Sequence, residues 1–147
     1  MKRPTASRRS GVSHWAAIIV ERGIGSQEVE MASSGLTPSV MLVLTNVPDE
    51  ASADLIERTL LEEGLVACIN RLPEVSSRYH WDGRIEEARE IPLLCKTIEA
   101  RYVELERRLS ELHPYDVPEI IAWHPARVST AYAAWVAQCC AAPPKLV

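Results

Sequence analysis

Hydrophobic and polar positions alternate most clearly between Leu65 and Thr97, where two strand-like runs flank the dipeptide Asp82-Gly83. Asp-Gly tolerates the positive φ angles of a type I′ turn, so this stretch predicts one long β-hairpin. A two-residue loop fixes the register, because it determines which residues face each other. The expected pairs are Trp81 with Arg84, Tyr79 with Glu86, and Arg78 with Glu87, the last joining opposite charges.

The hairpin is too long for the domain that carries it. Each arm of about fifteen residues reaches roughly 50 Å at about 3.3 Å per residue, whereas a compact fold of about 110 residues is only about 35 Å across. On the outer half Val75, Tyr79 and Trp81 share one face, an apolar stripe that needs a covering partner. We infer an obligate homo-oligomer. In this register Pro73 lies opposite Pro92, and because neither can donate to a ladder, we expect a break there.

The rest of the chain predicts three helices and two further strands. The apolar run 40–45 is typical of a central strand buried on both faces, and Pro48 with acidic residues after it begins a helix that ends at Gly64. The later elements are a helix over 101–112, a strand over 117–123, and a helix from Ala131 to about Cys140 that is capped by Ser129 or Thr130. The order β-α-β-β-α-β plus one helix predicts an α+β, ferredoxin-like sandwich with both long helices on one face.

Length and charge limit the class of protein. The chain has 147 residues and a net charge of −4, which fits one domain with a real core. Residues 1–38 hold five Lys/Arg and three Asp/Glu, which leaves eleven and seventeen for 39–147 and a net charge of −6 there. This acidic part argues against a nucleic-acid partner. We expect 1–38 to be a disordered or non-native N-terminal extension, 39–142 to form the domain, and no membrane to be bound.

Four cysteines, Cys68, Cys95, Cys139 and Cys140, show no CxxC spacing. Cys68 and Cys95 lie in apolar strand runs, which favours buried free thiols over a disulfide framework. A reducing, cytoplasmic location fits best.

A few polar residues are candidates for chemistry. His113 ends a helix at His-Pro-Tyr, where it either caps the helix or binds a ligand. Glu119 and Lys96 lie at strand ends, as a buried ion pair or as part of a pocket. The acidic run Glu86, Glu87 and Glu90 on the outer hairpin either gathers cations at a subunit junction or forms a solvated face, and such runs are usually solvated. No GxGxxG, Walker, HExxH or GxSxG motif occurs, so no catalytic residue is assigned.

Six segments in series resemble the CutA divalent-cation tolerance family over about residues 40–138. They are Val47-Pro-Asp-Glu-Ala, Leu65-Val-Ala-Cys-Ile-Asn70, Tyr79-His-Trp-Asp-Gly83, Glu86-Glu87 with Leu-Leu-Cys-Lys-Thr97, His113-Pro-Tyr-Asp-Val-Pro-Glu119, and Tyr132 with Trp135. The resemblance implies a ferredoxin-like subunit and a tight homotrimer in which long hairpins pair across subunits. It also implies a role in tolerance of copper and other divalent metals, without established catalysis.

The metal ligands match only in part. In family members proposed to bind copper, the ligands are a Cys and a His-His pair, and the corresponding positions here are Thr45, Leu112 and His113. Copper prefers sulfur and nitrogen donors over hydroxyl or alkyl groups, so His113 alone remains as a ligand. The resemblance therefore implies weak binding of Cu(II) or another divalent cation at His113, and no required cofactor.

The sequence thus predicts a cytoplasmic homotrimer of the metal-tolerance class, a binding or signalling module and not an enzyme. The first alternative is a trimeric sensor that binds an anionic metabolite in pockets between subunits, lined by Lys96, Glu119, Tyr79, Trp81 and Glu86. The second is an enzyme with His113 as general base, which is disfavoured because no oriented nucleophile or acid partner is visible.

Overall fold

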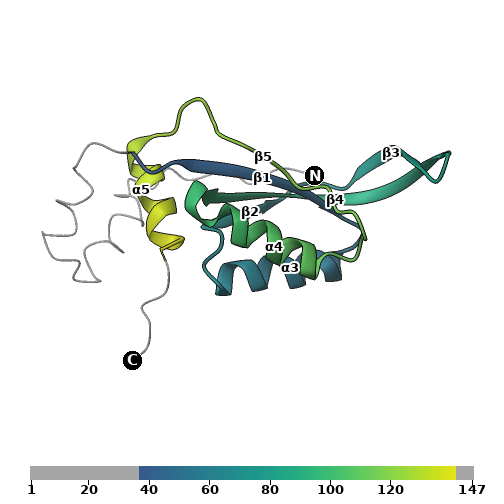
Figure 1. Ribbon diagram of the computed structural model, residues 1–147, viewed down its shortest axis with the longest axis horizontal. Coiled ribbons are helices and arrows are strands. Elements are labelled where there is room, and N and C mark those ends of the chain that lie inside the picture. The colour runs from purple at the N-terminus through teal and green to yellow at the C-terminus, as the bar shows by residue number, and fades with distance from the viewer. Residues whose placement is uncertain (1–36, 142–147) are drawn as a thin grey trace, which may run out of the picture. The chain divides into compact units, whose positions relative to one another are not determined.

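The computed structural model describes residues 37–141 (Figure 1), so most of the expected extension and residue 142 lie outside the described residues. The elements are β1 (Val40–Val47), α3 (Glu50–Glu62), β2 (Cys68–Arg71), β3 (Val75–Trp81), β4 (Arg84–Ile98), the 3-10 helix η1 (Glu99–Arg101), α4 (Tyr102–Leu112), β5 (Ile121–Trp123) and α5 (Thr130–Cys139). Among residues 37–141, no helix has the length and apolar character that a membrane span requires.

One antiparallel sheet organises these residues. Its strands lie in the order β2-β4-β1-β5, and β3 pairs only with the outer half of β4. Figure 1 shows α3 and α4 on the same face of the sheet and α5 at one end. This arrangement confirms the predicted α+β, ferredoxin-like sandwich with a long central hairpin and an extra C-terminal helix.

The sheet has one covered face and one open face, and the alternating burial of β1 shows which is which. Met41, Val43 and Val47 are buried in the core beneath α3 and α4, whereas the alternate residues Leu42 and Leu44 are half-buried. The strand was expected to be buried on both faces, but in the single chain only one of its faces is fully buried. We call the other side, which α3 and α4 do not cover, the open face.

The helix α5 covers one end of the open face. Its Ala133 and Val136 are buried in a second apolar cluster together with Val40 of β1. Of the two expected caps, Ser129 is the residue that begins the helix, because its side chain accepts a hydrogen bond from the backbone N–H of Tyr132 at 3.3 Å.

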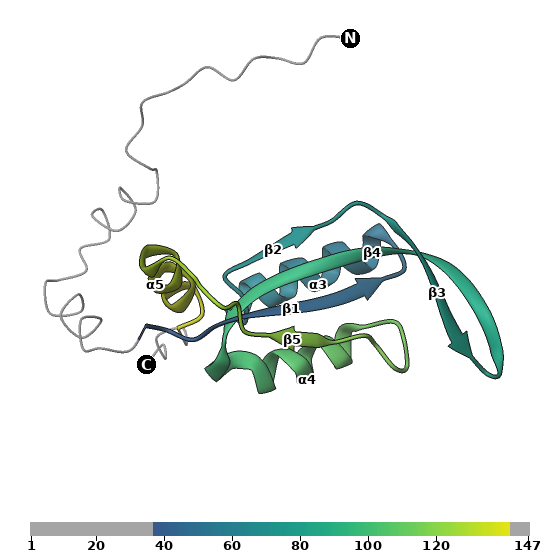
Figure 2. The same ribbon diagram turned by 90° about the horizontal axis from the view of Figure 1, so that it is seen from above.

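The strand β3 and residues 84–90 of β4 form a curved arm that leaves the body of the domain (Figure 2). All three expected pairs occur in its ladder, from Trp81 and Arg84 at the tip to Arg78 and Glu87. The turn has φ 48° at Asp82 and 73° at Gly83, as the Asp-Gly dipeptide predicted. The sequence therefore gave the register of the arm correctly.

The root of the arm differs from the expected register by one residue. Arg71 pairs with Leu93 and Val75 pairs with Glu90, so residues 72–74 face only residues 91–92. This is a β-bulge, and Leu72, not Pro73, donates to the Pro92 carbonyl at 2.9 Å. The expected break occurs, but the predicted Pro73–Pro92 pairing is wrong. The one extra residue lies between the register of β2 with β4 and the register of β3 with β4.

Arg71 holds the strand in place immediately before this bulge. Its guanidinium contacts three carboxylates of α3, at 2.9 Å from Nε to Glu57, at 2.6 Å to Asp54, and also at Glu50. Because the side chain is partly buried, this network ties the end of β2 to the helix more firmly than an exposed pair would.

The last strand is shorter than expected. A strand was predicted over 117–123, but β5 begins at Ile121. Pro118 has no N–H to donate, and Glu119 instead accepts a hydrogen bond from the side chain of Asn46 on β1. The residues before Ile121 therefore form a loop, part of which lines the site described below.

Gly64 ends α3 in a Schellman motif. The N–H of Leu65 donates to the Leu60 carbonyl at 3.0 Å and that of Gly64 to the Leu61 carbonyl at 3.1 Å, while Leu60 and Leu65 are both buried. Gly64 has φ 64°, and an added Cβ would lie 3.6 Å from the nearest atom, the Cys139 carbonyl oxygen. A larger residue at this position is therefore disfavoured by the positive φ angle and not by a steric clash.

We expect Gly64→Ala to lower the free energy of unfolding by about 1 kcal/mol through this left-handed conformation. Gly64→Asn is the matched variant, since Asn adopts positive φ more readily and should lose less. Urea unfolding of both variants measures the difference. An equal loss in the two would show that steric contact, and not φ, decides.

Candidate functional site

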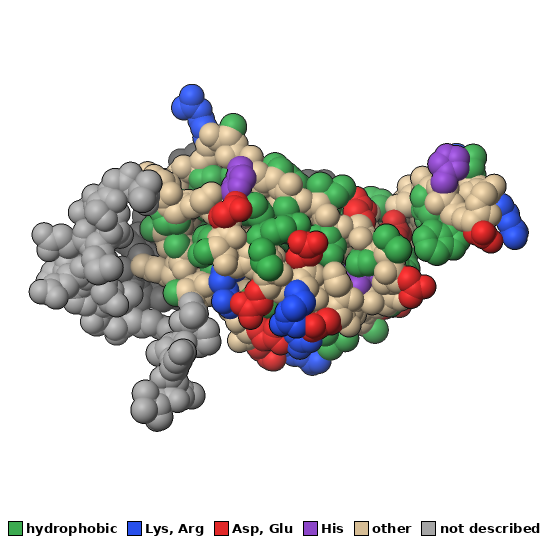
Figure 3. Space-filling view, viewed as in Figure 1, with side chains coloured by type: hydrophobic (Ala, Val, Ile, Leu, Met, Phe, Trp, Pro, Cys, Tyr) green, Lys and Arg blue, Asp and Glu red, His purple; other side chains and the backbone are tan. Residues whose placement is uncertain are grey.

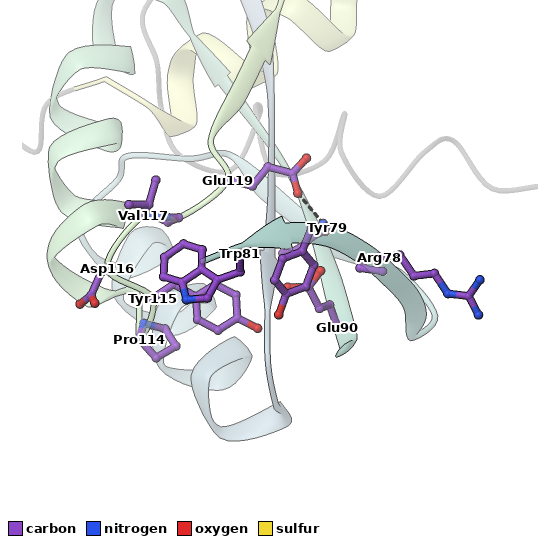
Figure 4. A pocket seen from close by; sticks show the side chains of 12 residues that line it. Arg78, Tyr79, Trp81, Glu90, Pro114, Tyr115, Asp116, Val117 and Glu119 are labelled. Atoms are coloured by element: carbon purple, nitrogen blue, oxygen red, sulfur yellow. Dashed lines mark hydrogen bonds between the residues drawn. The ribbon is translucent and has the colours of Figure 1, made fainter. Parts of the chain in front are cut away.

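A cavity of about 760 Å³ lies between the root of the arm and the loop 114–119 (Figure 4). Its volume is in the range of small-molecule sites. The lining residues are Asn46, Ser77, Arg78, Tyr79, Trp81, Glu90, Pro114, Tyr115, Asp116, Val117, Pro118 and Glu119. The bulge bends the arm, and the short β5 leaves residues 114–119 as a loop. The cavity is the space between this arm and this loop.

Three aromatic rings form the apolar wall. Figure 4 shows Tyr79 and Trp81 of β3 and Tyr115 of the loop turned toward the same space. Tyr79 and Trp81 reach the cavity because the register set by the Asp82-Gly83 turn places them on the face of the arm that carries Glu90. Tyr79 is 41% exposed and Trp81 is 54% exposed, so both side chains are accessible to a ligand or a partner.

Glu90 is the buried carboxylate of the cavity, with 7% of its surface exposed. It lies beside Tyr115, and burial together with a hydrogen bond to Glu90 raises the pKa of the Tyr115 hydroxyl to about 12. Tyr115 is therefore a neutral donor at physiological pH. The Glu90 carboxylate therefore has a hydrogen-bond donor in Tyr115.

Asn46 and Glu119 define the opposite wall. The Asn46 amide donates from Nδ2 to Glu119 Oε2 at 2.5 Å. Its Oδ1 atom is buried and has no hydrogen-bond partner in the described part of the chain. The pair thus fixes a second carboxylate beside the cavity and leaves a buried acceptor next to it.

The charge around the cavity is acidic. Glu90, Asp116 and Glu119 line it, with Arg78 as the single cation among its lining residues. The Arg78 guanidinium points away from the space in Figure 4 and contacts Glu87 on the neighbouring strand, with 3.3 Å between Nε and Oε2. The three acidic residues of the lining therefore have no cation paired with them among the lining residues.

His113 lies behind the cavity and is 7% exposed. Its Nε2–H donates to the Asn46 carbonyl at 2.9 Å, and its Nδ1 accepts from the Tyr115 N–H at 3.1 Å. Burial lowers the pKa of His113, although the bond to Asn46 and the nearby Glu90 act in the opposite direction. The imidazole is held neutral and joins β1 to the loop.

The residues near His113 do not fit a preformed copper centre. Both ring nitrogens are occupied, Thr45 is fully buried, and Leu112 packs against the core with an alkyl side chain. Within residues 37–141, no group of three His, Cys, Asp or Glu side chains is placed to hold a metal ion. The prediction that His113 binds a divalent cation weakly stays a prediction, and such binding has to displace an existing hydrogen bond.

The structure brings together part of the predicted pocket. Tyr79, Trp81 and Glu119 line the cavity, whereas Lys96 and Glu86 do not. Lys96 is buried and donates to Asn70 Oδ1 on β2, so the alternative of a Lys96–Glu119 ion pair is wrong.

Sequence reasoning missed the central carboxylate. Glu90 belongs to the acidic run that was expected to be solvated, but it is buried where β4 leaves β1. The signal was available in the hairpin register, since Glu90 falls opposite Val75 on the face of the aromatic stripe. Tyr115 and Asn46 were missed because they approach the arm from distant segments.

The fold and the cavity define a class, a ferredoxin-like α+β protein with a ligand-sized site at the root of a projecting hairpin. Residues 41–139 match the CutA1 divalent ion tolerance protein family, and the chain belongs to that family.

Relatives and solved structures agree with this assignment. The divalent-cation tolerance protein CutA of Pyrococcus horikoshii is 43% identical over 97 residues, which cover 66% of this chain and 94% of that protein. The crystal structure of CutA from Xylella fastidiosa has a TM-score of 0.67 at 39% identity and covers 69% of this chain and 97% of its own. CutA1 from Shewanella sp. SIB1 has a TM-score of 0.68 at 31% identity, covering 73% and 100%.

We expect the neutral state of His113 to make the free energy of unfolding fall as the pH drops from about 7 to about 5. Burial lowers the pKa of folded His113, so the unfolded chain takes up a proton near pH 6.5 before the folded chain does. His113→Asn should weaken this pH dependence, measured by urea unfolding at constant protein concentration. His80→Asn, at the exposed arm, should leave it unchanged; an equal effect of the two would contradict the assignment.

Proposed function

We propose that this chain acts in divalent-cation tolerance as a homotrimer whose arms and open faces are covered by sister copies. The observation that carries the proposal is the exposed apolar surface: Tyr79 and Trp81 on the arm, and Ile121 at 51% and Trp123 at 41% exposure on β5. Isolated apolar side chains are normal on a surface, but a row of large rings and aliphatic groups indicates a protein partner. We propose three copies because the resemblance to the CutA family implies a homotrimer.

The unpaired strand edges support the same assembly. Residues 84–90 of β4 pair with β3 on one side, whereas β1 pairs with β4 only as far as Ile91. The backbone groups along the other edge are therefore open to a further strand. In the view of Figure 3, charged side chains gather over α3 and α4, hydrophobic ones lie along the body above them, and the arm carries both kinds, so the helical side suits solvent.

A binding or signalling role is supported over catalysis by the state of His113. The residue considered as a general base uses both ring nitrogens for internal hydrogen bonds. A base needs a free nitrogen within reach of the substrate proton. His113 instead fixes the loop that forms the cavity wall.

The cavity favours a second candidate function, a sensor of small molecules. Its volume of about 760 Å³ is far larger than a metal ion needs, and its wall combines rings with fixed polar groups. The predicted ligand of this sensor is an anionic metabolite, but Glu90, Asp116 and Glu119 would repel it.

We also propose a cytoplasmic location. Its support is that all four cysteines are free, as the sequence predicted, with Cys95 and Cys140 buried. Free thiols are typical of a reducing compartment.

We expect Trp81→Ala to weaken the assembly by about 3 kcal/mol per interface, because the truncation removes a large ring from a covered surface. Sedimentation velocity over a dilution series measures the shift from trimer to monomer. Val103→Ala is the matched control, since Val103 is 79% exposed on α4 and its loss should leave the trimer unchanged. A trimer of undiminished stability in Trp81→Ala would contradict the proposed covering of the arm.

We expect the protein to bind Cu(II) only weakly, with a dissociation constant of about 1 mM, because a cation at Nδ1 of His113 has to displace the Tyr115 N–H. Calorimetric titration should show this binding lost in His113→Ala and retained in His80→Ala. Tight binding would contradict the predicted weakness, and binding that survives the loss of His113 would exclude His113 as the metal ligand.

A further inference from the structure

We propose that Arg84 at the tip of one arm pairs with Glu119 at the root of the arm of a sister copy. The residues Glu90, Asp116 and Glu119 are called the acidic site here, and the single chain leaves this site incomplete. The inference rests on the homotrimer proposed above and names a contact that holds two copies in register. Because sister copies cover the arm, part of a neighbour occupies the space that the single chain leaves open.

The first argument is the difference between the two faces of the arm. On one face the cations are paired within the chain: Arg78 contacts Glu87 at 3.3 Å, and Arg89 contacts Glu74 at 2.8 Å. Arg84 is exposed on the other face, which carries the aromatic rings, and it makes no ion pair with any side chain of residues 37–141. The face with the paired charges suits solvent, and Arg84 is available to a partner.

The second argument is the state of the acidic site. None of its three carboxylates forms an ion pair within the part of the chain that the structure describes. Glu90 is buried and already has Tyr115 as a donor, whereas Glu119 is exposed and can be reached from outside (Figure 4). Asn46 holds one oxygen of Glu119 at 2.5 Å, and the other oxygen has no hydrogen-bond partner among residues 37–141. Glu119 is therefore a fixed acceptor with one oxygen to spare.

The third argument is the symmetry of a closed ring. Three identical copies form a ring when one surface of each copy meets a different surface of the next copy. The arm is such a surface, because it turns aside from the body in Figure 2 and ends in the Asp82-Gly83 turn. Its strand β3 has 7 residues, so the tip lies roughly 20 Å from the root at about 3.3 Å per residue. An arm of this length reaches a neighbour, while its root receives the arm of another copy.

The chemistry of the two groups suits a covered contact. A guanidinium presents a planar fork of N–H donors that matches a carboxylate, which is why Arg is the preferred cation at interfaces. When a sister copy covers the arm, Arg84 and Glu119 both lose water, and a charge that is buried without a partner is costly. Pairing the two groups removes this cost in both copies.

A double-mutant cycle on trimer dissociation tests the pair, measured by sedimentation over a dilution series. We expect Arg84→Gln and Glu119→Gln each to raise the dissociation constant per interface about tenfold. The double variant should also raise it about tenfold, and not about a hundredfold, because the second change removes a contact that is already lost. Arg78→Gln is the matched control, since Arg78 pairs with Glu87 on the other face and should show no coupling to Glu119→Gln.

Mixed trimers show whether the pair lies between copies. Arg84→Glu and Glu119→Arg should each dissociate more readily than the wild type, because like charges then meet at every interface. An equimolar mixture should form trimers at concentrations where neither variant does, since two of the three interfaces then join opposite charges. Circular dichroism confirms that both variants are folded.

Failure to recover on mixing, or additive effects of Arg84→Gln and Glu119→Gln, overturns the inference. The wild type separates this failure from that of the assembly. A wild-type chain that sediments as a monomer overturns the homotrimer and the pair with it, whereas a stable wild-type trimer with additive effects overturns the pair alone.

Discussion

The structure depends on the length of a single strand. β4 has 15 residues, of which 91–98 lie between β1 and β2 while 84–90 have only β3 beside them. The inner half is fixed by hydrogen bonds on both edges, so the outer half is a rigid continuation of the central strand and cannot fold back onto the body. Glu90 is the first residue of β4 beyond the pairing with β1. Beyond this point the loop after α4, and not β1, lies beside β4, and the cavity is the space between them.

Local sequence determined most of the fold. The arm register follows from a period of two and one Asp-Gly turn, and the end of α3 follows from Gly64, so both could be predicted from neighbouring residues. The bulge could not, because both registers place apolar residues toward the core and no single residue type marks the extra position. The short β5 is a similar case: Pro118 was consistent with the start of a strand, and the side chain of Asn46 decided otherwise.

The candidate site was predictable in part for the same reason. The aromatic stripe was visible in the alternation of β3, and Glu119 stood out beside Pro118. Glu90 looked like a member of a solvated acidic run, since its burial depends on a loop more than twenty residues away. Lys96 was expected in the pocket because it ends an apolar strand, but an amide on the adjacent strand already accepts its hydrogen bond. The sign of the charge in a cavity depends on such distant neighbours, which a linear motif does not specify.

The extra residue between Arg71 and Val75 lies between two registers that are determined independently. The Asp82-Gly83 turn determines which face of β3 carries Tyr79 and Trp81, whereas the pair Arg71 and Leu93 belongs to the register of the inner sheet. The bulge absorbs the difference of one residue between the two. A change of chain length within 72–74 therefore alters the bend at the root of the arm and leaves the aromatic side chains on their original face.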